Sequence, residues 1–156
     1  MKLLKPGDKA PYFELLNQSS STVSLSDYKG KKLLVYFYPK ADTSGCTKQA
    51  CGIRDAEPDL AGLGVAAVGI SPDKPTKLQK FDEKHGLGFT LLSDQDHAIA
   101  QAYGAWGEKK MYGKTYEGVI RSAFLLDEQG TIMEAWYNIK PLDTVPKTLE
   151  ALEKLT

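Results

Sequence analysis

The fold of this chain is decided by the stretch LLVYFYPKADTSGCTKQAC, residues 33–51. Its first part, Leu33 to Tyr38, is a near-continuous apolar run, which is typical of a strand buried on both faces of a parallel sheet. A proline and several small polar residues follow and predict a turn. A helix is then expected to begin near Cys46, so the stretch places a cysteine at the start of a helix, directly after a central strand.

The remaining chain predicts strands and helices in alternation. The amino-terminal segment is interpreted as a hairpin, with strands at 11–16 and 22–25. Pro58 interrupts the helix that follows Cys46, and residues 104–118 are expected to form a long irregular loop. Further strands are predicted at 65–70, 89–92, 119–126 and 132–137, and helices at 46–62, 75–85, 94–103 and 144–155.

This order of elements predicts an α/β protein with a thioredoxin-like fold. Helices are expected to flank a central mixed β-sheet, and the first hairpin forms an N-terminal extension. We expect a single domain spanning residues 1–156, because a chain of this length can bury one sizeable core.

Composition excludes several function classes. The chain is 42% hydrophobic and 26% charged, with a formal net charge of zero. It has no basic block, so no nucleic-acid partner and no acidic membrane surface are expected. No apolar run approaches the ~20 residues that span a bilayer. Residues 1–6 lack the apolar region of a signal peptide, so the expected location is the cytoplasm.

Two cysteines, Cys46 and Cys51, are too few for a secreted disulfide scaffold. In a reducing cytosol such a pair is more often catalytic, redox-sensing or metal-binding. A metal site is disfavoured, because His85 and His97 lack zinc-ligand spacing to the cysteines. At a helix start, the unpaired backbone N–H groups and the helix dipole favour a thiolate, the nucleophilic form of cysteine. The alternative for both cysteines is an inert place in the core.

The spacing of the two cysteines predicts a conformational change. If both lie in one helix, five residues of separation give a rise of about 7.5 Å along the axis. The Cα atoms are then roughly 8–9 Å apart, beyond the ~7 Å limit for a disulfide. A disulfide therefore requires the first turns of the helix to unwind, and Gly45 and Gly52 lower the cost of that unwinding.

The segment Pro39-x-x-x-Thr43-x-x-Cys46 resembles the Pro-x-x-x-Thr/Ser-x-x-Cys signature of the peroxiredoxins. A second cysteine five residues later is similar to the peroxiredoxin Q, or bacterioferritin comigratory protein, subfamily. The segment GVIRSAFLLD, residues 118–127, is similar to the strand that carries the family's active-site arginine, here Arg121. The segments 6–11 and 103–107 extend the resemblance to nearly the whole chain.

The resemblance implies a peroxidase that needs no cofactor. Cys46 would attack a hydroperoxide and become a sulfenic acid, and Cys51 would condense with it to an intramolecular disulfide. Thr43 and Arg121 would bind thiolate and peroxide, and Pro39 would shield the site from water. A thioredoxin or glutaredoxin-like protein would reduce the disulfide, and resolution within one chain favours a monomer.

Two positions depart from many relatives, which have proline where Ser44 stands and glutamate where Gln49 stands. Trp106 and Tyr112 are interpreted as packing residues that could also contact a substrate tail. Two other functions stay open at this point. One is a redox sensor on the same fold, and the other is a protein disulfide reductase, which the absence of Cys-x-x-Cys disfavours.

Overall fold

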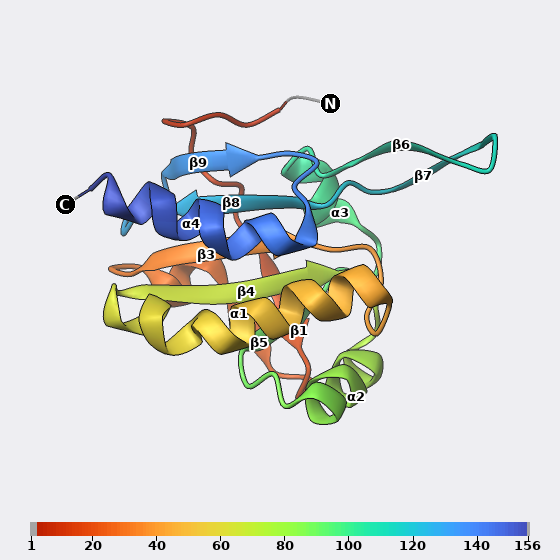
Figure 1. Ribbon diagram of the computed structural model, residues 1–156, viewed down its shortest axis with the longest axis horizontal. Helices are drawn as coiled ribbons and strands as arrows, with labels where there is room; N and C mark the ends of the chain where they lie inside the picture. The colour runs from red at the N-terminus through yellow and green to blue at the C-terminus, as the bar shows by residue number, and fades with distance from the viewer. Residues whose placement is uncertain (1–2, 156) are drawn as a thin grey trace.

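A seven-stranded mixed β-sheet forms the centre of the computed structural model, which describes residues 3–155 (Figure 1). Residues 1, 2 and 156, which include the start of the segment considered for a signal peptide, lie outside this range. The strand order is β2-β1-β5-β4-β3-β8-β9, with β3, β4 and β5 parallel and the other pairs antiparallel. The strands are β1 Glu14–Asn17, β2 Thr22–Ser24, β3 Lys32–Phe37, β4 Val65–Ser71, β5 Thr90–Ser93, β8 Ser122–Leu126 and β9 Ile132–Trp136.

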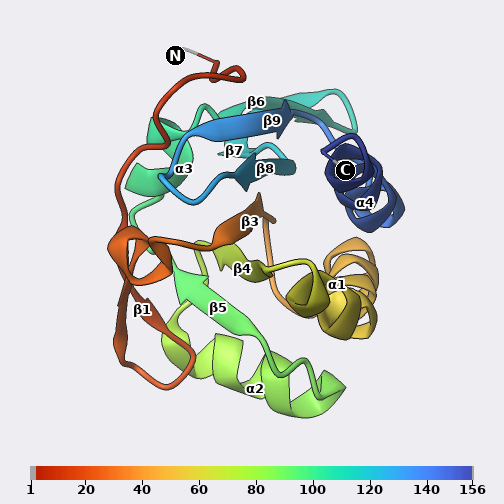
Figure 2. The same cartoon turned by 90° about the vertical axis from the view of Figure 1, so that its left-hand side faces the viewer.

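Helices cover both faces of this sheet (Figure 2). Three of them, α1 (Ser44–Gly62), α2 (Pro75–His85) and α4 (Thr144–Glu153), pack on one face, and the short α3 (Ala98–Ala102) packs on the other. The 3₁₀ turns η1 (Leu25–Tyr28) and η2 (Pro141–Asp143) complete the described elements. The predicted central mixed sheet flanked by helices is confirmed.

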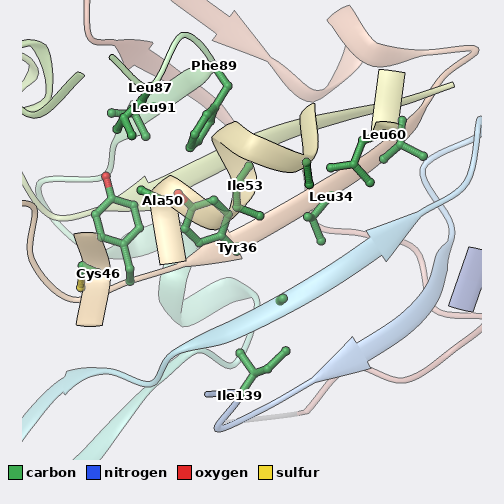
Figure 3. Close-up of a cluster of buried hydrophobic side chains, with 14 of the residues drawn as sticks. Leu34, Tyr36, Cys46, Ala50, Ile53, Leu60, Leu87, Phe89, Leu91 and Ile139 are labelled. Carbon is green, nitrogen blue, oxygen red and sulfur yellow. The ribbon is translucent and has the colours of Figure 1, made fainter. Parts of the chain in front are cut away.

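Strand β3 is buried on both faces, as its apolar run predicts. Leu34 and Tyr36 face the helices α1, α2 and α4, whereas Leu33, Val35 and Phe37 face the cluster that contains α3. Figure 3 shows Tyr36 and Leu34 beneath the side chains of α1. Because β3 is fully enclosed, its carboxyl end holds the start of α1 in a fixed place.

The amino-terminal hairpin is joined to the main sheet. Strand β1 pairs with β2 and also, antiparallel, with β5, through Leu16 opposite Ser93 and Asn17 opposite Leu92. The hairpin extension therefore forms one edge of the seven-stranded sheet.

The prediction of an irregular loop at 104–118 is wrong. The segment forms a separate two-stranded hairpin of β6 (Trp106–Met111) and β7 (Lys114–Val119), which projects from the body of the molecule (Figure 1). At its tip Tyr112 and Gly113 have φ values of 52° and 75°, as a tight two-residue turn requires. Most of β7 is exposed, so the sequence carries no alternation of apolar and polar residues to mark it.

The structure also corrects several other predicted elements. The strand predicted at 119–126 belongs to two strands in the structure, because β7 ends at Val119 and β8 begins at Ser122. Arg121 therefore lies in the connection between them and not in a strand. The helix predicted at 94–103 begins only at Ala98, because the Asp94 carboxylate accepts the N–H groups of the first helical turn. Pro58 does not interrupt α1, which runs unbroken across it.

None of the helices within residues 3–155 is both long enough and apolar enough to traverse a bilayer.

Gly69 lies opposite Tyr36 in the parallel β3–β4 pair, and a Cβ at this position would come within 2.7 Å of the tyrosine ring. The substitution Gly69→Ala should therefore lower the free energy of unfolding by about 1–3 kcal/mol, measured by urea denaturation. Gly62→Ala, which meets open space, is the matched control. Equal stability of the two variants would contradict the prediction.

Candidate active site

Cys46 is the third residue of α1, and its side chain is only 1% exposed. Thr43 occupies the N-cap position with an extended backbone, and its carbonyl oxygen accepts the N–H of Thr47 at 2.8 Å. The N–H groups of the first turn have no intrahelical partner, and the positive end of the helix dipole lies there. The sulfur of Cys46 is therefore placed where a negative charge is favoured.

Arg121 makes the direct contact to this sulfur. Its Nη2 donates to Sγ of Cys46 at 3.3 Å. The antiparallel register of β3 and β8 sets this approach, because Phe37 at the end of β3 lies opposite Ser122. Arg121 immediately precedes Ser122, so it lies at the same edge of the sheet as the start of α1.

Gln49 and Thr144 hold the arginine, and the sequence interpretation gave neither of them this role. Nη1 of Arg121 donates to Oε1 of Gln49 at 2.6 Å, and Nε2 of Gln49 donates to Oγ1 of Thr144 at 2.9 Å. Both Gln49 and Thr144 are buried. Gln49 is three residues after Cys46 on one helix face, a spacing that could have indicated it. Thr144 lies 95 residues further along the chain, and no local pattern marks it.

Thr43 and Pro39 flank the cysteine in the turn between β3 and α1. The hydroxyl of Thr43 donates to the carbonyl oxygen of Lys40 at 2.9 Å, and the side chain is exposed. Pro39 is half-buried. In this conformation the Thr43 hydroxyl is occupied by the backbone of its own turn, and it makes no cap bond to α1.

Cys51 lies in the same helix as Cys46, half-buried against the core beneath α1. Both cysteines are free thiols, and α1 is continuous across them. In an intact helix their Cα atoms are too far apart to form a disulfide. The structure thus brings Cys46, Arg121 and Gln49 together, and it holds Cys51 apart from them.

A polar cavity of about 370 Å³ opens beside Arg121. Lys109 lies in its wall, and burial, followed by the charge of Arg121, lowers the pKa of its ammonium group. The other residues lining the cavity are Glu108, Lys110, Ile120, Asn138 and Ile139. Another cavity, of about 400 Å³, lies at the opposite end of β3 beside Leu33, far from the cysteines.

The histidines and aromatic residues considered in the sequence lie outside this site. His85 contacts Asp42, and His97 stacks on Trp106 with ring centroids 3.8 Å apart. Tyr112 is 97% exposed at the tip of the β6–β7 hairpin. Within residues 3–155, His, Cys, Asp and Glu form no group of three or more that could hold a metal ion.

The chain is similar to known proteins along almost its whole length. The sequence profile of the AhpC/TSA family matches residues 6–135. The chain is 52% identical to a putative peroxiredoxin Bcp of Haemophilus influenzae over 155 residues, which cover 99% of this chain and all of that one. It resembles a cysteine-to-serine mutant of Xylella fastidiosa PrxQ with a TM-score of 0.92 and 28% identity, covering 99% and 98% of the two chains. It resembles the bacterioferritin comigratory protein of Xanthomonas campestris with a TM-score of 0.87 and 32% identity, covering 97% and 96%.

The thioredoxin-like sheet, the cysteine at the start of α1 and these relatives together place the chain in the class of thiol peroxidases. The chain belongs to the AhpC/TSA family. Within that family its relatives are peroxiredoxins of the Q, or bacterioferritin comigratory protein, subfamily. The predicted family and fold class are confirmed, and the family implies a peroxide substrate and a thiol reductant.

The substitution Gln49→Glu tests how a charge at this position affects the sulfur of Cys46. It keeps an acceptor for Arg121, and the Thr144 hydroxyl can donate to the new carboxylate. The added negative charge near Sγ disfavours the thiolate, so alkylation of Cys46 by iodoacetamide at neutral pH should become slower. The measurement is the rate of alkylation in a Cys51→Ser background, in which only Cys46 reacts.

Gln79→Glu makes the same charge change on the exposed face of α2 and is the control. An unchanged alkylation rate for Gln49→Glu would show that the residue has no electrostatic effect on the sulfur.

Proposed function

We propose that this protein reduces hydrogen peroxide and organic hydroperoxides through Cys46. The contact of 3.3 Å between Nη2 of Arg121 and Sγ of Cys46 carries the proposal. The thiolate attacks one peroxide oxygen, the O–O bond breaks, and the leaving oxygen takes a proton to become water or an alcohol. Cys46 becomes a sulfenic acid. Alkyl peroxide reduction activity is attributed to the bacterioferritin comigratory protein of Xanthomonas campestris, which supports the organic substrates.

Arg121 acts on both the thiolate and the transferring oxygens. Its planar guanidinium offers several donors, and Gln49 holds one edge of it, so Nη2 stays directed at the sulfur. The backbone N–H of Cys46 adds a fixed donor where charge shifts during the transfer. Thr43 joins them when its hydroxyl turns from the Lys40 carbonyl oxygen to the peroxide, and Pro39 limits the access of water.

Cys51 completes the oxidative half of the cycle. Its sulfur attacks the sulfenic sulfur, an S–S bond forms, and the hydroxyl leaves as water. Because α1 holds the two cysteines apart, its first turns unwind before the bond forms. Gly45 and Gly52, on either side of the segment, make that unwinding less costly.

A thioredoxin or a glutaredoxin-like protein reduces the disulfide and so restores both thiols. The protein consists of one domain and acts in the cytoplasm. It works as a monomer, because resolution by Cys51 needs no second chain. Turnover in the presence of the reductant separates this enzyme from a redox sensor, which would stop after one equivalent of peroxide.

The deciding experiment is to mix the reduced protein with one equivalent of hydrogen peroxide. Both thiols should disappear, the intact mass should fall by two hydrogens without dimer formation, and thioredoxin should restore the thiols. Loss of one thiol with a gain of oxygen would keep Cys46 as the reacting residue and remove Cys51 from its role. No reaction over minutes would refute the peroxidase.

The substitution Arg121→Met tests whether the arginine assists the transfer. It removes the donors at the sulfur while keeping an unbranched side chain, so the rate of sulfenic acid formation should fall about 10²- to 10³-fold. The measurement is rapid mixing with peroxide in the Cys51→Ser background, followed by mass spectrometry. Lys110→Met, on the same cavity wall, is the control. Equal rates for the two variants would show that Arg121 does not assist the transfer.

A further inference from the structure

The turn before α1 contains a residue in a disfavoured conformation. Asp42 has a φ of 62°, in the left-handed region that residues other than glycine seldom adopt. The N–H of the preceding Ala41 donates to Oδ2 of Asp73 at 2.7 Å, which fixes the start of the turn. Such a conformation persists only where surrounding contacts hold it.

Two side chains from the last turn of α2 make those contacts. Nε2 of His85 lies 2.9 Å from Oδ1 of Asp42, and Nζ of Lys84 lies 2.8 Å from Oδ2. Their hydrogen bonds, that of His85 first, lower the pKa of the Asp42 carboxyl group. A carboxylate only accepts, so Nε2 of His85 carries the proton in this bond.

His85 is the better fixed of the two partners. Its side chain is 20% exposed, against 63% for Lys84. Its ring packs edge-on against Phe81, with centroids 5.4 Å apart, and Phe81 is buried. A long exposed lysine loses side-chain entropy when it pairs, so most of the positional constraint comes from His85.

The backbone of His85 holds α1 as well. Nη1 of Arg54 donates to the carbonyl oxygen of His85 at 2.6 Å. Asp42 stands four residues before Cys46, and Arg54 stands three residues after Cys51. His85 therefore binds the chain on both sides of the segment that must unwind.

We infer that His85 is a positioning residue that ties residues 42 and 54 to α2 and opposes the unwinding of the helix between them. The inference rests on the proposed function and adds a control on its second step. While α1 is folded, the Cys46 sulfenic acid cannot reach Cys51. A second peroxide can then oxidise it to sulfinic acid, with release of water or an alcohol. These contacts of His85, called the tether below, thus set the relative rates of disulfide formation and of over-oxidation.

The test compares His85→Leu, which loses the side-chain donor, with His85→Gln, whose amide can donate to Asp42 again. Both keep the backbone carbonyl that Arg54 binds. After one equivalent of hydrogen peroxide, the disulfide should form about three- to tenfold faster in His85→Leu. In excess peroxide, less sulfinic acid should form per turnover. His85→Gln should return both values toward those of the unmodified protein. Glu83→Leu, on the exposed side of the same turn, is the control.

A second measurement separates the tether from the chemistry. Amide hydrogen exchange of residues 44–51 in the reduced protein should speed up in His85→Leu by the same factor, because it reports the opening of α1 directly. Asp42→Asn, which tolerates the left-handed backbone, should give a smaller change in the same direction and serves if His85→Leu fails to fold.

Rates within twofold of the unmodified protein, or a His85→Gln variant identical to His85→Leu, would overturn the tether. The absence of any disulfide in the unmodified protein would refute the proposed function instead, and the exchange measurement would still test the tether.

Discussion

The structure around Cys46 depends on one contact, the guanidinium of Arg121 on the sulfur. That contact needs β3 and β8 in one register, because a shift would move Ser122, and Arg121 directly before it, away from the end of β3. It also needs Gln49 of α1, which binds the arginine, and Thr144, the first residue of α4, which binds Gln49. A local charge contact is thus fixed by three elements that are distant in the sequence.

Helix α1 meets two opposed requirements. It must be folded to place the first-turn N–H groups and Arg121 around Cys46, and under the proposed mechanism it must open to let Cys51 approach. The bonds of Gln49 and the contacts of His85 favour the folded form, whereas the glycines at 45 and 52 reduce the cost of opening.

The sequence predicts those features whose cause is local. The apolar run of β3, the proline that opens α2 and the glycine that ends it each mark an element correctly. The β6–β7 hairpin was missed because its exposed strands leave no apolar pattern. Arg121 could be matched to the family by its neighbours, but the support from Thr144 depends on a contact across the whole domain fold, which one sequence does not report. The catalytic or binding roles of Cys46, Arg121, Thr43, Pro39 and Cys51 remain predictions.

The projecting hairpin has a practical consequence for the study of this protein. Tyr112 and Gly113 form its tip, and Tyr112 is almost fully exposed. The connection at Ile120 and Arg121 joins the other end of β7 directly to β8. An exposed tight turn of this kind accepts inserted residues most readily. A fluorescent group or an affinity tag inserted between Tyr112 and Gly113 would therefore lie at the tip of the β6–β7 hairpin and leave the seven-stranded sheet unchanged.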